Sequence, residues 1–197
     1  MLKILKKKGF IIKKFEDKSI FSLIEKIIKK NFSNNDKFYA SMPRKKFSKL
    51  ALKCQKEINQ LDLIKKFHYS EKNFLNKILK NDQPMYSSSG YLRCVRPAKN
   101  SVGNDFLPFH RETFYSRRKS TPHCVNVWFP IMNVTKENIM KYVPNSHKIP
   151  DKKIKRRRIK QNGYKISKHS SEHKLGFAYA PKKISKGVNL NKAVPFQ

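Results

Sequence analysis

The hydrophobic pattern of the chain changes at residues 82–90 (DQPMYSSSG), a turn-rich stretch that separates two kinds of sequence. Before this stretch, apolar residues recur at the spacing of amphipathic helices. After it come short segments that are rich in β-branched and aromatic residues and are separated by turns, a pattern typical of strands. We therefore expect an α+β protein with a mainly helical part over residues 1–81 and a sheet-containing part over residues 82–197.

The helical part contains one clear helix and two weaker ones. In residues 17–30 (DKSIFSLIEKIIKK), isoleucine and leucine at positions 20, 23, 24, 27 and 28 form one stripe, and Asp17 or Ser19 can cap the helix. Residues 45–67 and 71–80 show the same pattern less regularly. A short strand is predicted ahead of these helices, at residues 9–15 (GFIIKKF).

The second part is expected to be built from strands and one long loop. The predicted strands are residues 91–97, 106–116, 124–134 and 140–144. Residues 151–174 (DKKIKRRRIKQNGYKISKHSSEHK) are highly charged and weakly patterned, so we expect a loop or a mobile lid there. The chain then ends at NLNKAVPFQ without an obvious closing element.

Composition limits the class of protein. A chain of 197 residues suits one domain with a buried core. Its net charge of +33 attracts polyanions such as nucleic acid, anionic lipid or phosphorylated substrates. Lysine is spread along the whole chain together with many isoleucines, asparagines and phenylalanines, so we prefer the codon bias of an AT-rich genome as the explanation of the charge.

The cysteines and the hydropathy bear on the compartment. The chain has three cysteines, Cys54, Cys94 and Cys124, and none of them belongs to a Cys-x-x-Cys motif. This indicates a reduced protein without a disulfide framework. The basic N-terminus lacks the uninterrupted apolar stretch of a signal peptide. No segment approaches the roughly 20 apolar residues that a membrane span needs. We therefore expect a cytoplasmic protein.

One pair of polar residues in the predicted strand 106–116 (FLPFHRETFYS) suggests a metal site. His110 and Glu112 are two positions apart, and on a strand such side chains project from the same face. An imidazole with a carboxylate suits Fe(II), and a site of two histidines and one carboxylate leaves positions open for a co-substrate and oxygen. On spacing alone, an exposed polar pair on an edge strand is the simpler interpretation.

The pair is the first member of an ordered set of motifs, and this set favours the metal site over the exposed polar pair. The set consists of His110 and Glu112, then Asn126, Trp128 and Pro130 in one strand, then TKEN at 135–138 and PNSH at 144–147. It resembles the Fe(II)/2-oxoglutarate dioxygenases of the phytanoyl-CoA dioxygenase superfamily, and most closely the branch found among bacterial genes of surface-carbohydrate biosynthesis. The close resemblance covers residues 91–148.

The resemblance implies a fold and a reaction. The fold would be a double-stranded β-helix (a jelly-roll, cupin-like core) with the N-terminal helices packed outside it. The protein would bind Fe(II) and 2-oxoglutarate and would oxidise a small molecule such as a sugar or a sugar nucleotide.

The resemblance also assigns roles to residues. His110 and Glu112 would be metal ligands, and the face carrying Asn126 and Trp128 would line the co-substrate pocket. We favour Arg93 over Arg96 as a carboxylate partner. A core position is the alternative for Trp128, as it usually is for a lone tryptophan.

The chain departs from the family pattern at two points. Glu112 stands where aspartate is usual, and a longer arm must fold back to hold the same iron distance. No convincing second histidine with a following arginine comes after PNSH; His169 and His173 lie in a polar stretch, and His147 and His123 have structural or peripheral interpretations. The sequence therefore predicts a truncated oxygenase with an incomplete jelly roll and weak or no activity.

A second hypothesis belongs to a different class of function. The chain would then be a non-enzymatic basic protein that binds nucleic acid or another polyanion through residues 151–174 and its other lysines. This stretch has no interleaved aromatic residues and no recognisable nucleic-acid-binding motif, so a solvated loop is preferred there.

Overall fold

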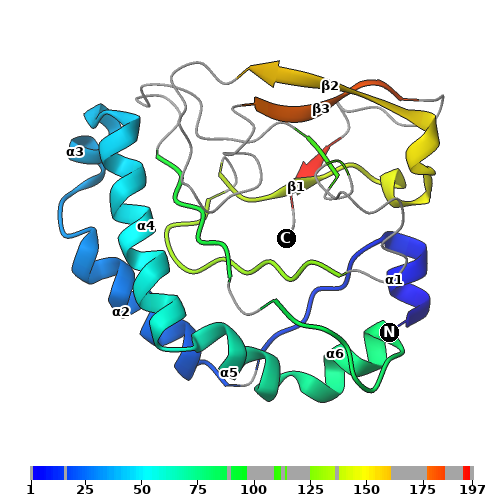
Figure 1. Cartoon of the computed structure of the whole chain (residues 1–197), viewed down its shortest axis with the longest axis horizontal. Coiled ribbons are helices and arrows are strands. Elements are labelled where there is room, and N and C mark those ends of the chain that lie inside the picture. Colours follow the sequence, from blue (N-terminus) through cyan, green and yellow to red (C-terminus); the bar gives the residue numbers. More distant parts are fainter. Residues whose placement is uncertain are drawn as a thin grey trace. The chain divides into compact units, whose positions relative to one another are not determined.

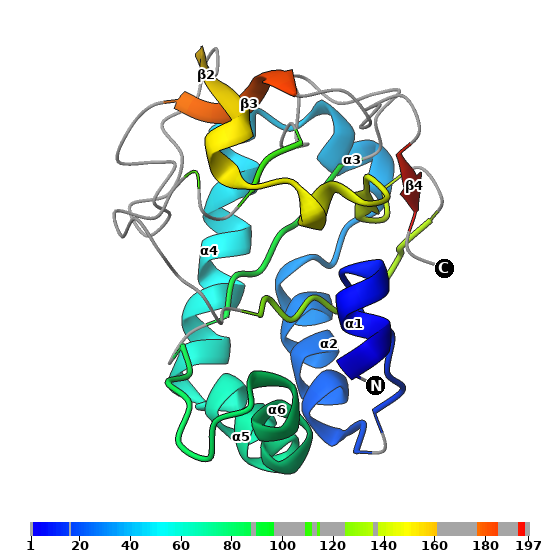
Figure 2. The same cartoon turned by 90° about the vertical axis from the view of Figure 1, so that its right-hand side faces the viewer.

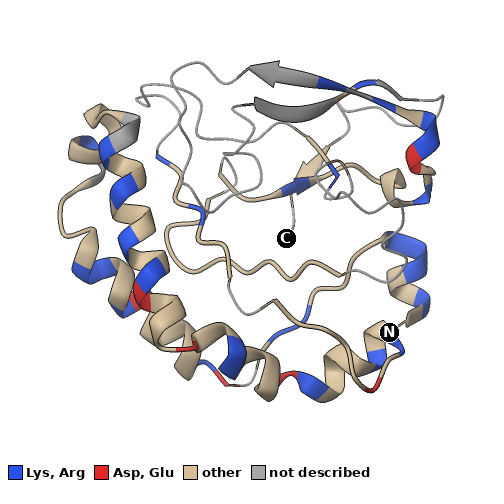
Figure 3. Ribbon diagram, viewed as in Figure 1, with Lys and Arg blue, Asp and Glu red and all other residues tan. Residues whose placement is uncertain are grey.

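A computed structural model describes most of the helical part and selected segments of the rest. The described residues are 2–15, 17–87, 90–96, 109–111, 114, 125–135, 138–160, 177–184 and 193–195. They belong to two compact units, whose helices and strands are labelled in Figures 1 and 2. We call Lys13–Gly103 with His123–Val134 the helical unit, and Met1–Ile12 with Asn104–Pro122 and Thr135–Gln197 the strand unit. Lysine and arginine occur in both units, and acidic residues are few (Figure 3).

The helical unit contains the predicted helices. Its elements are α2 (Ser19–Asn31), α3 (Asp36–Ser41), α4 (Arg44–Gln60), α5 (Leu63–Ser70) and α6 (Lys72–Leu79). The predicted helix 17–30 is confirmed as α2, and the segments 45–67 and 71–80 are confirmed as helical, with a break at Asp62, whose φ is 52°. The helix α3 was not predicted; it is short and begins where the Asn35 side chain accepts a hydrogen bond from the Phe38 amide.

The core of the helical unit forms where α2 packs against α4 and α5. The predicted apolar stripe of α2 is buried except at Leu23, which is 41% exposed. The buried cluster consists of Ile20, Ile24, Ile27, Ile28, Cys54, Ile58, Leu63 and Phe67. Burying a side chain of this size stabilises a fold by roughly 1.5–3 kcal/mol, so the stripe accounts for why α2 lies where it does.

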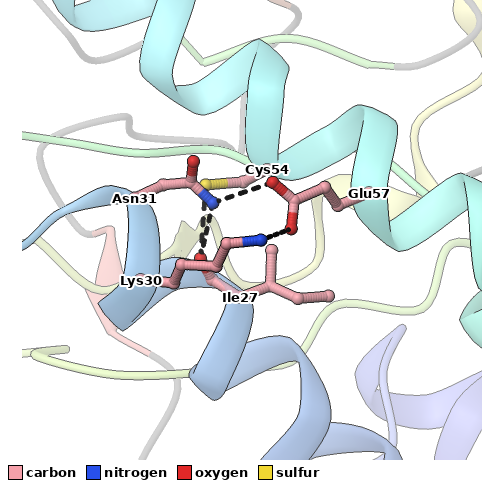
Figure 4. Close-up of polar contacts among 5 residues, drawn as sticks. All are labelled: Ile27, Lys30, Asn31, Cys54 and Glu57. Carbon is pink, nitrogen blue, oxygen red and sulfur yellow. Dashed lines mark hydrogen bonds and ion pairs between the residues drawn. The ribbon is translucent and has the colours of Figure 1, made fainter.

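A polar network also links α2 to α4 (Figure 4). The Asn31 amide donates to the Ile27 carbonyl (2.9 Å) and to Glu57 Oε1 (3.2 Å), and the Lys30 ammonium pairs with Glu57 Oε2 (3.2 Å). Hydrogen bonds from Asn31 and Lys30 lower the pKa of Glu57. Burial raises the pKa of the neighbouring Cys54 thiol to about 11, so this cysteine is a packing residue.

Two irregular segments, 90–96 and 125–134, complete the helical unit. Leu92, Phe129, Ile131 and Met132 pack against the buried cluster. The described parts of the predicted strands 91–97 and 124–134 are not strands. Apolar residues of these segments are packing residues, as the pattern indicated. They pack onto helices, however, and the described residues of the segments do not pair with a strand.

The strand unit contains two small antiparallel sheets. In one, β1 (Lys141–Tyr142) pairs with β4 (Val194–Pro195); in the other, β2 (Ile154–Lys160) pairs with β3 (Phe177–Ile184), with an irregularity between Lys155 and Arg156. The short 3₁₀ helices η3 (Ser146–Lys148) and η4 (Asp151–Lys153) lie between β1 and β2. Part of the predicted strand 140–144 is thus confirmed as β1.

Two expectations were wrong. Residues 154–160, expected within a loop, form β2; the basic residues of this segment interrupt the hydrophobic alternation of a strand, whereas the pairing uses backbone hydrogen bonds. The predicted strand 9–15 is absent, because Gly9 at φ 84° ends helix α1 (Leu2–Lys8) and the residues after it form no strand.

The described residues therefore combine helices with small sheets, as expected of an α+β chain. A jelly roll is not visible among them, since each of the two sheets has two strands. None of the described helices is long and apolar enough to cross a membrane.

Candidate functional site

The segment that carries His110 is fixed by the residue next to it. Arg111 reaches the corner formed by η3 and η4, where its guanidinium donates to Asp151 Oδ1 (2.5 Å) and to the Ser146 carbonyl. The Arg111 side chain is 22% exposed, so this ion pair is partly shielded from water. Two hydrogen bonds from one guanidinium, to Asp151 and to the Ser146 carbonyl, hold the backbone beside His110 in one place.

The backbone turns directly after this anchor. The Phe114 amide donates to the Arg111 carbonyl (2.9 Å), and the Phe114 side chain is buried. A hydrogen bond between residues three apart belongs to a turn or a 3₁₀ helix. The described part of the predicted strand 106–116 is therefore not a strand. His110 is partly buried, and Glu112 lies outside the described residues.

The PNSH motif forms a corner against the N-terminal helix. Asn145 has a positive φ of 61°, and the Ser146 amide donates to the Val143 carbonyl (3.1 Å). The His147 ring packs on Gly9, and its Nε2 lies 3.1 Å from the Lys6 carbonyl oxygen. A carbonyl only accepts, so Nε2 carries the proton. His147 is thus engaged with the C-terminal end of α1, in line with the structural role expected for it.

The residues expected to line the co-substrate pocket lie in the helical unit. Phe129 faces the core, with ring centroids 4.8 Å from Phe21 and 5.6 Å from Phe67. Asn126 is exposed, and Trp128 is 39% exposed. The interpretation of Trp128 as a core residue is therefore wrong, and its ring is accessible to a ligand.

The two arginines of the segment 90–96 differ in burial. Arg93 is exposed, with its guanidinium 5.5 Å from the Tyr91 ring centroid. Arg96 is 1% exposed, donates to the Met42 carbonyl (2.6 Å), and lies 5.2 Å from the centroid of the Phe47 ring. Arg96 thus ties the segment to the beginning of α4. The structural roles of Arg96 and Arg111 were not predicted from the sequence. Each arginine stands near apolar residues, and this pattern could have indicated that its side chain packs against the protein.

The metal-binding expectation can be compared only with the described residues. They contain no group of three His, Cys, Asp or Glu side chains that could hold a metal ion. Of the expected ligands and candidates, His110 is described, while Glu112, His123, His169 and His173 are outside. The donor types of His110 and Glu112 suit Fe(II), so the chemistry of the pair fits even though its geometry is not described.

Comparison with protein families decides the identity of the chain. The family model for phytanoyl-CoA dioxygenase (PhyH) matches residues 24–187, well over half of the chain. The chain belongs to the PhyH family. Searches found no curated protein and no solved structure with a significant match.

Membership in the PhyH family confirms part of the resemblance seen in the sequence. The match extends well beyond residues 91–148 and includes residues 24–81 of the helical part. Members of the PhyH family depend on Fe(II) and 2-oxoglutarate, and the family implies a cupin-like fold. The comparisons lend no support to the alternative of a non-enzymatic basic protein.

Proposed function

We propose that this PhyH-family protein is an Fe(II)/2-oxoglutarate-dependent oxygenase that acts on a small molecule. The observation that carries the proposal is the family match over residues 24–187, which includes His110, Glu112, Asn126 and Trp128. When bound, Fe(II) and 2-oxoglutarate supply the oxidation of a substrate together with the decarboxylation of 2-oxoglutarate to succinate. A sugar or a sugar nucleotide is the substrate class suggested by the resemblance to the carbohydrate-biosynthesis branch.

In this proposal His110 and Glu112 hold the metal ion. Arg111 supports His110, because its contacts with Asp151 and Ser146 fix the adjacent backbone. The glutamate arm is one methylene longer than the usual aspartate, so more side-chain freedom is lost on binding. We therefore propose that Glu112→Asp tightens metal binding.

The third ligand is proposed to come from a histidine outside the described residues. The chain has six histidines. His147 is engaged with Lys6 and Gly9, and His68 stacks on Tyr86 at a centroid distance of 4.5 Å. His123, His169 and His173 remain as candidates, and substituting each of them alone by alanine shows which one matters.

Asn126, Trp128 and Arg93 are the proposed contacts of the co-substrate. Their exposure leaves the amide, the indole and the guanidinium available to a ligand. A hydrogen bond between a charged carboxylate and a donor of this kind contributes roughly 1.5–3 kcal/mol. Loss of Arg93 should therefore weaken 2-oxoglutarate binding about tenfold or more.

Thermal stabilisation by ligands tests the proposal directly. Under anaerobic conditions, 2-oxoglutarate should raise the Tm only when Fe(II) or Mn(II) is present, because a ligand that binds the folded state stabilises it. His110→Ala and Glu112→Ala should abolish this shift, whereas His68→Gln, a matched control at another histidine, should preserve it. No shift in the unmodified chain would refute the proposal.

Turnover is a separate expectation. The sequence after PNSH contains no convincing histidine and arginine pair of the kind that completes the site in the family, so we propose that succinate formation by the 197-residue chain is weak. Succinate can be measured by mass spectrometry with and without Fe(II). Vigorous, iron-dependent succinate formation would contradict the expectation of low activity and would support the proposed reaction.

A further inference from the structure

The solvent-facing side of α4 consists largely of lysines. Lys46, Lys49, Lys53 and Lys56 are exposed, while Phe47, Cys54 and Ile58 on the other side are buried. At 100° per residue, the spacing of three, four and three residues keeps the four lysines within an arc of about 80°. At 1.5 Å per residue, they extend over about 15 Å of the helix. We call these four residues the lysine ridge.

The ridge has little internal neutralisation. Its neighbours are three or four residues apart, and like charges at these spacings repel one another. Glu57 is the acidic residue of α4; its carboxylate is bonded to Lys30 and Asn31 of α2, and the charge of Lys53 makes a smaller contribution to its lowered pKa. Within the described part of the chain, none of the four lysines takes part in an ion pair. Blue segments recur along α4 with a single red band (Figure 3).

We propose that the lysine ridge binds the phosphate backbone of a nucleic acid without sequence preference. A row of cations about 15 Å long matches a polymer that carries phosphates at regular short intervals. Lysine presents a compact charge that contacts phosphate oxygens, whereas base recognition relies mainly on bidentate groups such as arginine and asparagine. The proposal concerns a surface of the helical unit and does not depend on iron or 2-oxoglutarate.

The chemistry of α4 distinguishes this partner from a lipid surface. A helix that lies on a membrane places large apolar side chains next to its basic face. Among the described side chains of α4, the exposed ones are lysines and Gln60, and the large apolar residues are buried or partly buried within the helical unit. Attraction by charge alone, which the ridge can supply, is what a polyphosphate backbone requires.

The experiment must separate the ridge from the charge of the whole chain. One variant carries Lys46→Gln, Lys49→Gln, Lys53→Gln and Lys56→Gln. The matched control carries Lys65→Gln, Lys66→Gln, Lys72→Gln and Lys77→Gln on α5 and α6, where the lysines are also exposed. Both variants lose the same charge, and lysine and glutamine have similar helix propensities, so both helices should form.

Binding is measured by fluorescence anisotropy with a labelled single-stranded oligonucleotide of about 20 nucleotides, in EDTA, over a range of salt concentrations. Each phosphate contact contributes about 0.7 to the slope of log K against log salt for single strands. The ridge variant should therefore lose up to about 3 units of slope and at least tenfold in affinity, while the control should stay within about twofold of the unmodified chain.

Two further variants keep the test decisive if the fourfold substitution fails to fold. Lys46→Gln with Lys49→Gln, and Lys53→Gln with Lys56→Gln, should each reduce the slope by about half of the full effect. Equal losses in ridge and control variants would overturn the proposal, because bulk charge would then explain binding. It would also be overturned if the unmodified chain did not bind, or if the ridge variant lost binding only to vesicles containing phosphatidylserine.

Discussion

Replacing Gly9 by alanine should destabilise the strand unit for two separable reasons. Gly9 ends α1 with φ at 84°, and its amide donates to the Leu5 carbonyl (2.7 Å). A Cβ atom at this position would lie 2.5 Å from both Cγ and Nδ1 of His147. Ordinary contacts between such atoms are about 3.5–4.0 Å, so either the ring or the backbone must move.

The magnitude follows from these two terms. Holding an L-residue in the left-handed region costs about 1–2 kcal/mol. Relieving an overpacked contact costs about 1–3 kcal/mol more. Gly9→Ala should therefore lower the free energy of unfolding by about 2–5 kcal/mol, a large fraction of the 5–15 kcal/mol that is usual for a folded domain.

A double-mutant cycle with His147→Ala separates the two terms. His147→Ala alone removes the hydrogen bond to the Lys6 carbonyl and should cost about 0.5–1.5 kcal/mol. In that background Gly9→Ala should cost only the backbone term of about 1–2 kcal/mol, which gives a coupling of about 1–3 kcal/mol. Urea denaturation followed by circular dichroism supplies the four stabilities. A coupling near zero would refute the contact between Gly9 and His147.

Three further predictions concern buried or partly buried side chains. Cys54, with its pKa raised to about 11 by burial, should resist thiol reagents at neutral pH in the folded chain and react only on unfolding, as followed by mass spectrometry; fast labelling in the folded state would contradict this. Desolvation lowers the pKa of His68, so the folded state disfavours protonation of this imidazole. The contribution of the neutral His68 side chain to stability should therefore be complete above the unfolded pKa of 6.5 and should decline as the pH falls below it. Urea midpoints of the unmodified chain and His68→Gln should therefore converge on acidification, and a constant difference would argue against desolvation. Arg96→Met should cost about 1.5–3 kcal/mol through the lost hydrogen bond to Met42, whereas Arg93→Met, at an exposed position, should change stability by less than about 0.5 kcal/mol; equal effects would contradict the difference in burial.

The helices could be predicted because their determinants are local. The stripe of α2 recurs every three to four residues, and its residues other than Leu23 are buried in the structure. Helix boundaries were less accurate, because the break at Asp62 depends on a single residue with positive φ. The pattern of residues 45–67 continues across that break, so it could not show where α4 ends and α5 begins.

The sheets could not be predicted because their determinants are distant in sequence. Tyr142 pairs with Val194, and Ile154 pairs with Ile184. Such pairings depend on which segment supplies the partner backbone, and basic side chains contribute no hydrophobic alternation from which a strand such as β2 could be recognised. The apolar segment 125–134 shows the converse, since it has strand-like composition but packs on helices through Phe129 and Ile131.

The candidate metal site was inferred in two ways, from the spacing of two residues and from the resemblance to a family. The inference from His-x-Glu spacing assumed an extended backbone, and the hydrogen bond from Phe114 to Arg111 shows a turn at the end of the described segment. The resemblance based on the ordered motifs did not need that assumption. It depends on the order of several motifs along the chain, and it does not require one pair of side chains to lie on an ideal strand. The family match over residues 24–187 therefore supports the chemistry. Loss of the metal-dependent stabilisation by 2-oxoglutarate in both His110→Ala and Glu112→Ala, with its retention in His68→Gln, would assign that chemistry to the pair.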